Sequence, residues 1–236
     1  MRVTAIVPAA GGGKRLGGEV PKQFLPLGGI PILARTLLVL FNSGVFREIV
    51  VAVPEGEMEF CQREIIEPYR ISGVVLIEGG KERQDSVYNG LKRASADSSL
   101  VFIHDGVRPF LLEGLIRTAI EETSIHRATV VAVPVKETIK EIGKKGLVVR
   151  TLERGRLWVA QTPQTFAHEL IKEAYRRAYL DGFRGTDDSS LVERLGVKVK
   201  VIPGDYENIK ITTQEDLTLA EEILRRRETH ASGARF

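Results

Sequence analysis

Short apolar runs alternate with helical patterns along most of the chain. The runs are rich in β-branched residues and end at proline, glycine or charged residues, which is typical of buried strands. They lie at residues 3–8, 48–53, 74–77, 100–103, 129–133 and 197–202, and a short extended piece follows at residues 208–211. Helical spacing is found at residues 30–41, 57–67, 84–94, 111–123, 167–180, 186–195 and 213–227. Because apolar strands alternate with helices, we predict a mainly parallel sheet covered on both faces.

The alternation lapses between Lys136 and Trp158. Here apolar and polar residues alternate on both sides of a glycine turn at residues 143–146. This pattern predicts a β-hairpin inserted into the domain. A single hairpin cannot bury its own apolar face, so we expect it to pack on a second subunit or, as an equal alternative, on its own domain.

The first predicted strand runs into a glycine-rich loop that carries several cations. Glycine N–H groups can approach an anion closely, and cationic side chains add full positive charge. The residues concerned are Ala10, Gly11, Gly12, Gly13, Lys14, Arg15 and Lys22. A Walker A loop is excluded because Arg15, not serine or threonine, follows Lys14. A dinucleotide-binding loop is excluded because Leu16 stands where its third glycine belongs. The loop predicts a site for the phosphates of a nucleoside triphosphate, against the alternative of a turn with solvated cations.

A second glycine loop, at Gly79 and Gly80, follows the third predicted strand and leads into a helix through Arg83 and Ser86. Backbone amides of this loop and the Ser86 hydroxyl are candidates to contact a base or a ribose. For Ser86 alone, a capped helix N-terminus is an equally economical explanation.

Asp105 follows the fourth predicted strand, with Gly106 beside it and Arg108 close by. A carboxylate at a strand end suits a Mg²⁺ ion that bridges substrate phosphates. The alternative is a helix-capping aspartate with a surface arginine. His104 precedes Asp105, and we expect it to be a packing residue and not a general base.

Composition limits the remaining possibilities. The chain has 236 residues, 43% hydrophobic and 28% charged, which is ample for the core of a globular domain. A net charge of +3, dispersed along the chain, argues against nucleic-acid or membrane partners. The single cysteine, Cys61, excludes an intrachain disulfide framework. We expect a cytoplasmic protein, because no apolar run is long enough to span a membrane and the N-terminus does not read as a signal peptide. The predicted domain limits are one domain over 1–228, an inserted arm at 136–157 and a tail at 229–236.

Five motifs, in order, resemble those of a known enzyme family. They are Pro-Ala-Ala-Gly-Gly-Gly-Lys-Arg-Leu with Pro-Lys-Gln, Gly-Gly-Lys-Glu-Arg-Gln-Asp-Ser-Val, His-Asp-Gly-Val-Arg-Pro-Phe, Leu-Trp-Val-Ala-Gln-Thr-Pro-Gln and Thr-Asp-Asp. The first is similar to the signature loop of sugar-nucleotide pyrophosphorylases. Together they resemble the 2-C-methyl-D-erythritol 4-phosphate cytidylyltransferases of the non-mevalonate isoprenoid pathway. The resemblance implies a three-layer α/β/α Rossmann-like nucleotidyltransferase fold with a mainly parallel mixed sheet and an inserted β-hairpin arm.

The resemblance also implies the reaction, in which CTP and methylerythritol phosphate give a CDP-alcohol and pyrophosphate. Arg15 and Lys22 would be catalytic, holding the triphosphate and stabilising charge at the α-phosphate. The residues expected to bind the nucleotide are Ala10, Gly11, Gly12, Gly13, Gly79, Gly80, Arg83, Ser86 and Asp105, with Asp105 also binding Mg²⁺. The residues expected to bind the alcohol phosphate are Arg108, Thr138, Arg154, Thr162, Thr186 and Lys210. Taken without the resemblance, most of this last set would pass for ordinary surface residues.

The family is a homodimer whose arm reaches across to the partner subunit. The resemblance therefore suggests that Thr138 and Arg154 serve the neighbouring subunit's site. Two departures from the family pattern are Lys81, where some members are acidic, and Gly106-Val107, where alanines are common. Ribitol 5-phosphate cytidylyltransferases, which make CDP-ribitol, carry similar loops with valine before the arginine, so they are the alternative.

Overall fold

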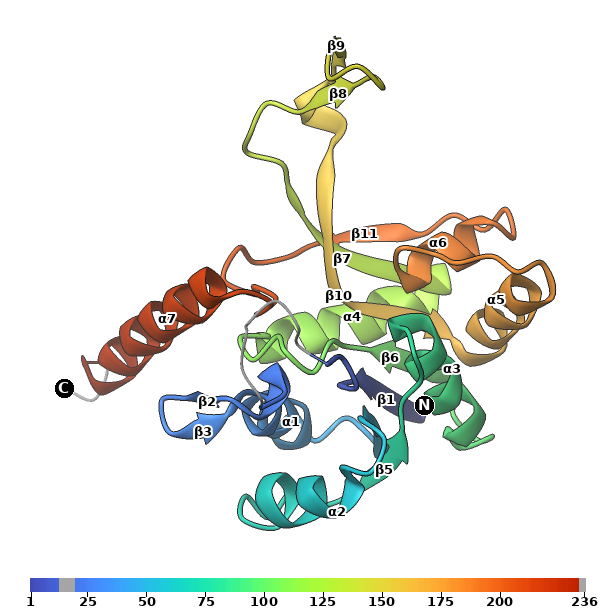
Figure 1. Cartoon of the computed structure of the whole chain (residues 1–236). Helices are drawn as coiled ribbons and strands as arrows, with labels where there is room; N and C mark the ends of the chain where they lie inside the picture. Colours follow the sequence, from blue (N-terminus) through green and yellow to red (C-terminus); the bar gives the residue numbers. More distant parts are fainter. Residues whose placement is uncertain (13–19, 234–236) are drawn as a thin grey trace.

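The computed structural model describes residues 1–12 and 20–233, with side chains as far as residue 229 (Figure 1). Seven of the described strands form one sheet in the order β11-β7-β10-β6-β1-β4-β5. Neighbouring strands are parallel except where β10 pairs antiparallel with β6 and β7. The bounds are β1 Val3–Pro8, β4 Glu48–Val53, β5 Val74–Glu78, β6 Leu100–Ile103, β7 Ala128–Pro134, β10 Trp158–Ala167 and β11 Lys200–Pro203. The predicted mixed, mainly parallel sheet is confirmed.

Helices cover both faces of the sheet because alternate strand residues point to opposite sides. On one face, Ala5 and Val7 of β1 belong to a buried cluster with α1, α2 and α4. On the other face, Ile6 packs in a second cluster with α3, α5 and α6. The bounds are α1 Ile32–Asn42, α2 Met58–Cys61, α3 Arg83–Arg93, α4 Glu113–His126, α5 His168–Leu180 and α6 Asp188–Glu193. The three-layer arrangement expected from the sequence is therefore present.

Strand β10 was not predicted. It is the longest described strand, at ten residues, and it lies in the middle of the sheet. Pro163 obscured it, because proline cannot donate to a strand ladder and argues against a central strand. The structure accommodates this proline with a cis peptide bond after Thr162 and a register shift between Ala160 and Gln164. The sequence motif at 157–164, which covers most of this strand, was recognised, but its extended conformation was not.

Smaller differences concern the ends of the predicted elements. The segment predicted as a helix at 57–67 is α2 followed by η3, a π-helical turn over Gln62–Ile66. The extended piece predicted at 208–211 forms no strand. The last helix, α7, spans Gln214–Gly233, so the residues up to 233 that were assigned to a tail continue the helix. A third cluster packs α7 against Leu27 of the small β2–β3 hairpin, whose strands are Pro26–Leu27 and Ile30–Pro31.

The predicted hairpin projects from the body as an arm (Figure 1). Strands β8, Lys140–Ile142, and β9, Val148–Thr151, pair antiparallel at its tip. The short 3₁₀ helix η4, Arg154–Arg156, leads from the arm back into β10. Among the described helices, none combines the length and apolar character that crossing a membrane would require.

Candidate active site

A pocket of about 300 Å³ lies beyond the carboxyl ends of β1 and β6. In open α/β sheets this is the edge where loops converge and ligands bind. Four segments that are distant in sequence line it, namely the loop after β1, the loop before α3, the end of β6 and the segment before α7. The lining residues are Pro8, Ala9, Ala10, Gly11, Gly12, Lys22, Gln23, Gly80, Lys81, Glu82, Arg83, Ser86, Asp105, Val107 and Lys210.

The two glycine loops meet at the mouth of this pocket. A Cβ on Gly79 would lie 2.2 Å from the Cβ of Ala10, and one on Gly80 would lie 2.2 Å from the Cβ of Asp85. Glycine is therefore required at both positions for steric reasons. Gly11 and Gly12 line the pocket with backbone, as an anion-binding loop requires. Gly13 and Arg15 lie outside the described residues.

Ser86 braces the second loop. Its hydroxyl accepts a hydrogen bond from the Gly80 N–H at 3.0 Å and donates one to the Glu82 carbonyl at 3.2 Å. The capping box of α3 is formed by Glu82 and Asp85. Ser86 lines the pocket, yet its hydroxyl hydrogen is already used within the loop, so in this conformation it can only accept from a ligand.

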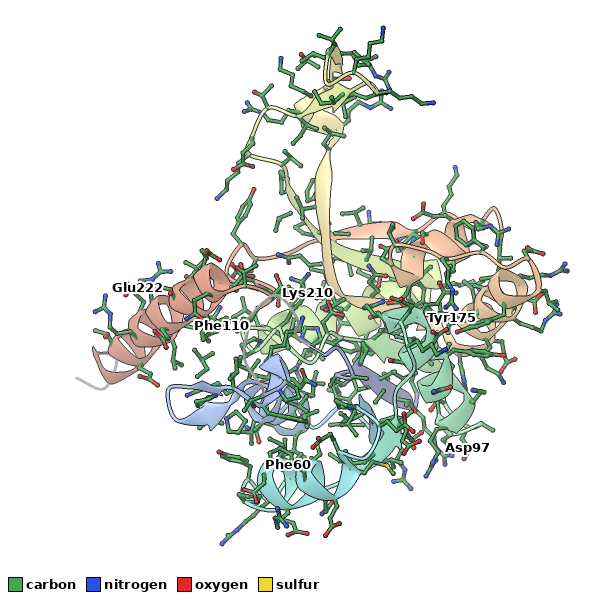
Figure 2. All side chains as sticks on the ribbon, viewed as in Figure 1. Phe60, Asp97, Phe110, Tyr175, Lys210 and Glu222 are labelled. Atoms are coloured by element: carbon green, nitrogen blue, oxygen red, sulfur yellow. The ribbon has the colours of Figure 1, made fainter. Side chains whose placement is uncertain are left out.

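Asp105 is surrounded by three cations. Its Oδ1 accepts from Arg83 Nε at 2.8 Å, and its Oδ2 lies 2.9 Å from Lys210 Nζ and 3.4 Å from Arg108 Nε. Burial by itself would raise the pKa of Asp105, but Arg83, Lys210 and Arg108 together hold it well below its usual range. The carboxylate is therefore ionised, and the cluster places positive charge beside the glycine loops. Figure 2 shows Lys210 at the centre of the molecule near the root of the arm.

His104 is fully buried behind Asp105 and holds the end of β6 in place. Thr162 Oγ1 accepts from the Asp105 N–H at 3.0 Å. The Arg108 carbonyl can only accept, so His104 Nε2 donates to it at 3.0 Å. Nδ1 of the neutral ring then accepts from the Thr162 hydroxyl at 3.0 Å. Burial lowers the pKa of His104 to about 4, so the ring is neutral at pH 7. The expectation that His104 is a packing residue agrees with this geometry.

The same hydrogen bonds bear on Thr162, which the sequence comparison assigned to the alcohol phosphate. Its side chain is 4% exposed, and its hydroxyl both accepts from and donates to neighbouring protein groups. In this structure Thr162 positions the Asp105 backbone and offers no donor to a ligand.

Arg108 and Lys210 are joined through Asn208. Arg108 donates from Nη1 to the Asn208 carbonyl at 2.6 Å, and the Asn208 amide donates to the Thr162 carbonyl at 2.8 Å. Asn208 is fully buried, and it holds the segment that carries Lys210 against β10. Sequence reasoning missed its role, since a lone asparagine before Ile209 shows no pattern that predicts burial.

Three of the expected substrate residues lie away from the pocket. Thr138 and Arg154 are exposed in the arm, where Arg154 Nη1 donates to the Lys136 carbonyl at 2.9 Å. Thr186 is exposed in the loop before α6. None of the three lines the pocket.

The donor set can hold a magnesium ion only together with a ligand. Among the described residues, no group of three or more histidine, cysteine, aspartate or glutamate side chains is placed to hold a metal ion. Asp105 supplies one ionised carboxylate in the pocket lined by Gly11, Gly12 and Lys22. This fits the way Mg²⁺ is usually held, by one or two carboxylates and the oxygens of substrate phosphates.

Known proteins resemble this chain over nearly its whole length. The profile of the IspD family, 2-C-methyl-D-erythritol 4-phosphate cytidylyltransferase, matches residues 3–226. The chain belongs to this family. A protein of that name from Geotalea uraniireducens is 49% identical over 230 residues, which are 95% of this chain and 97% of the relative. One from Syntrophus aciditrophicus is 46% identical over 228 residues, which are 96% and 97% of the two chains.

Solved structures of the family share the fold. The 4-diphosphocytidyl-2C-methyl-D-erythritol synthase from Anaerococcus prevotii is 33% identical, with a TM-score of 0.86 over 95% of this chain and 96% of that one. The 2-C-methyl-D-erythritol 4-phosphate cytidylyltransferase from Thermus thermophilus is 35% identical, with a TM-score of 0.78 over 95% and 100%. The resemblance seen in the five motifs is confirmed, and ribitol 5-phosphate cytidylyltransferases are not favoured.

Proposed function

We propose that this chain transfers the cytidylyl group of CTP to 2-C-methyl-D-erythritol 4-phosphate, giving 4-diphosphocytidyl-2-C-methyl-D-erythritol and pyrophosphate. The membership of the family over residues 3–226 supports this substrate pair. The observation that carries the proposal is the pocket itself, where glycine backbone from two loops faces a buried carboxylate bound by three cations. Such a pocket suits two anionic substrates that must approach each other.

The reaction needs charge stabilisation more than proton transfer. A phosphate oxygen of methylerythritol phosphate attacks the α-phosphorus of CTP, and the bond to the bridging oxygen of the β-phosphate breaks to release pyrophosphate. The attacking oxygen is already anionic at neutral pH, so no protein base is required. This agrees with His104, whose ring is buried and used in structural hydrogen bonds. Lys22 lines the pocket and, with Arg15 of the undescribed loop, would stabilise the charge that develops at the α-phosphate.

Asp105 is the residue that would hold a magnesium ion here. When bound with the triphosphate, the ion would neutralise phosphate charge and favour departure of pyrophosphate. Lys210 lies 2.9 Å from Asp105 Oδ2 and would bind the alcohol phosphate. Arg83 and Arg108 would continue to orient the carboxylate through Oδ1 and Oδ2.

We further propose a homodimer in which the arm contributes to the partner's site. Two observations support it. Thr138 and Arg154 do not line the pocket of their own chain, and the arm carries exposed apolar side chains. An arm that delivers these two residues to a second subunit accounts for both.

A mixing experiment tests the shared site. Arg154→Ala and Lys22→Ala are each expected to lower activity strongly as pure proteins. If Arg154 acts in the partner's site, each mixed dimer has one intact site, and an equal mixture should regain about a quarter of wild-type activity. If no activity returns although mixed dimers form, Arg154 acts within its own chain.

The substrate itself is tested by pyrophosphate release from CTP with methylerythritol phosphate or ribitol 5-phosphate. We expect release with methylerythritol phosphate at a much higher kcat/KM. Faster release with ribitol 5-phosphate would overturn the proposal, and UTP in place of CTP serves as the control for base choice.

A further inference from the structure

A buried ionic network lies directly behind the pocket and connects three helices to Asp105. Arg83, the first residue of α3, binds Asp188, the first residue of α6, through two hydrogen bonds of 3.1 and 2.8 Å. The Tyr175 hydroxyl of α5 donates to Asp188 Oδ1. The remaining side of the guanidinium presents Nε to Asp105 Oδ1 at 2.8 Å. Figure 2 labels Tyr175 in the region where α5 lies next to α6.

Asp188 is held in a single position. Its side chain is 1% exposed, and both oxygens accept hydrogen bonds, as a buried carboxylate requires. The start of α6 is fixed to β10 by Gln164, whose amide donates to Asp187 and whose carbonyl oxygen accepts from the Ser189 N–H. Asp187 caps the helix by accepting from the Ser190 N–H at 2.9 Å. The carboxylate of Asp188 is thus a fixed anchor relative to the sheet.

The network reaches the pocket only through Arg83. Asp188 and Tyr175 do not line the pocket, whereas Arg83 does and its side chain is 27% exposed. A buried ion pair is weak support for a contribution to stability, since an apolar replacement often serves as well. Here the pair fixes the guanidinium in the orientation in which Nε points at Asp105. This orientation of Arg83 holds the Asp105 carboxylate in place at the pocket.

We propose that Asp188 and Tyr175 are positioning residues for the cytidylyl transfer, because they clamp the Arg83 guanidinium so that its Nε fixes Asp105. The inference rests on the proposed function of this pocket. Without the clamp, Arg83 keeps its charge but gains the freedom to turn from Asp105 towards a bound triphosphate. Nucleotide binding is then retained, while the orientation needed in the transition state is lost.

The clamp predicts a separation of kcat from KM. In Asp188→Asn, the amide cannot accept both guanidinium hydrogen bonds, so we expect kcat to fall by about 10- to 100-fold with KM for CTP changed less than about threefold. Arg83→Lys should behave in the same way, because a single ammonium group cannot bridge Asp105 and Asp188 as the planar fork does. Tyr175→Phe removes one hydrogen bond and should lower kcat by about three- to tenfold.

The measurement is steady-state kinetics on the full chain with CTP and methylerythritol phosphate, together with calorimetric binding of CTP alone and thermal unfolding. Asp181→Asn is the matched control, since Asp181 makes an exposed ion pair with Arg194 and should leave kcat unchanged. A lower melting temperature with kcat within about twofold of wild type, measured on folded enzyme, would overturn the proposal. So would a large rise in KM at unchanged kcat, or an Arg83→Lys variant with normal kcat.

If Asp188→Asn does not fold, the kcat and KM values of Tyr175→Phe and Arg83→Lys test the proposal. Reduced kcat at unchanged KM supports the clamp, and normal kcat overturns it. A wild-type chain that releases no pyrophosphate from these substrates overturns the proposed function and this inference with it. An active wild type with unaffected variants overturns the clamp alone.

Discussion

Two parts of β10 lie in opposite surroundings. Within the body of the molecule, Thr165 and Phe166 are fully buried, and in the middle of the strand Thr162 Oγ1 accepts from the Asp105 N–H at the pocket edge. At its amino end, in the arm, Trp158 is 41% exposed and Val159 is 52% exposed. Further along the arm, Leu147 reaches 69% exposure. Charge is buried beside the middle of the strand, and apolar surface is exposed at its amino end.

This difference shows which part of the molecule is complete within one chain. At the pocket edge, Asp105 and Asp188 are each matched by cations from other segments, so the edge satisfies its own buried charges. In the arm, Ile142 and Val148 lie opposite each other across two strands and remain more than half exposed. A two-stranded hairpin has too little area to bury such residues. The exposed apolar residues of the arm are consistent with the proposed homodimer, and the pocket edge is consistent with the proposed anionic ligands.

The strongest test of the pocket edge is removal of its catalytic charge. Lys22→Ala should lower kcat by about 10²- to 10³-fold while weakening CTP binding far less, because the lysine acts on charge that develops in the transition state. From the sequence, we predict a similar fall in kcat for Arg15→Ala. Steady-state kinetics measure both effects, with Lys172→Ala on the exposed surface of α5 as control. A raised KM at unchanged kcat would contradict the catalytic role.

A charge introduced into the arm should prevent the chain from forming a dimer. Val148→Asp places a charge among the exposed apolar side chains of the arm. A desolvated, unpaired charge at an interface opposes association. We expect sedimentation velocity at micromolar concentration to show the 26.1 kDa monomer in place of a dimer. Leu180→Asp is the matched control, since Leu180 is 68% exposed at the end of α5, on the body of the molecule. A Val148→Asp protein that stays dimeric would separate the arm from dimerisation.

Acid should destabilise the pocket edge before it affects the arm. The folded chain keeps His104 neutral down to a pKa of about 4, whereas the unfolded chain takes up a proton near 6.5. Protons therefore favour the unfolded chain, and the free energy of unfolding should fall by up to about 3 kcal/mol as pH drops from 6.5 to 4. The lowered pKa of Asp105 adds a further loss only below its unfolded value of 3.8.

Urea unfolding at several pH values measures this slope. His104→Asn should flatten it between pH 6.5 and 4. His126→Asn is the comparison variant, because His126 is exposed beside Glu122 on α4 and makes no contact with the described residues of the pocket edge. An unaltered slope in His104→Asn would place the acid sensitivity elsewhere.

The smallest effect is expected from an ion pair of the arm. Arg150 and Glu141 lie 2.6 Å apart, with side chains 67% and 45% exposed. Water screens such a pair, so Arg150→Ala should lower the free energy of unfolding by less than about 0.5 kcal/mol in urea titrations. A loss above about 1 kcal/mol would show that Arg150 is buried in the folded assembly and not exposed as in the single chain.

Local patterns in the sequence were sufficient for much of this protein. Apolar runs and helical spacing predicted the parallel strands, most helices and the hairpin, because burial on a sheet or helix face imposes a period on the chain. Glycines beside cations predicted two ligand-binding loops, since close backbone approach excludes a Cβ, and both loops contribute to the lining of the pocket. The five sequence motifs identified the family.

Tertiary structure alone decided the position of β10 and the partners of the buried charges. Pro163 masks the strand locally, and only the flanking strands β6 and β7 supply the hydrogen bonds that hold it. Asp188 and Tyr175 read as a helix start and an apolar-face residue, respectively. Their connection to Asp105 passes through Arg83, which lies 105 residues before Asp188 in sequence. A periodic pattern reports which face of an element is buried, but it cannot report which distant side chain completes a buried charge.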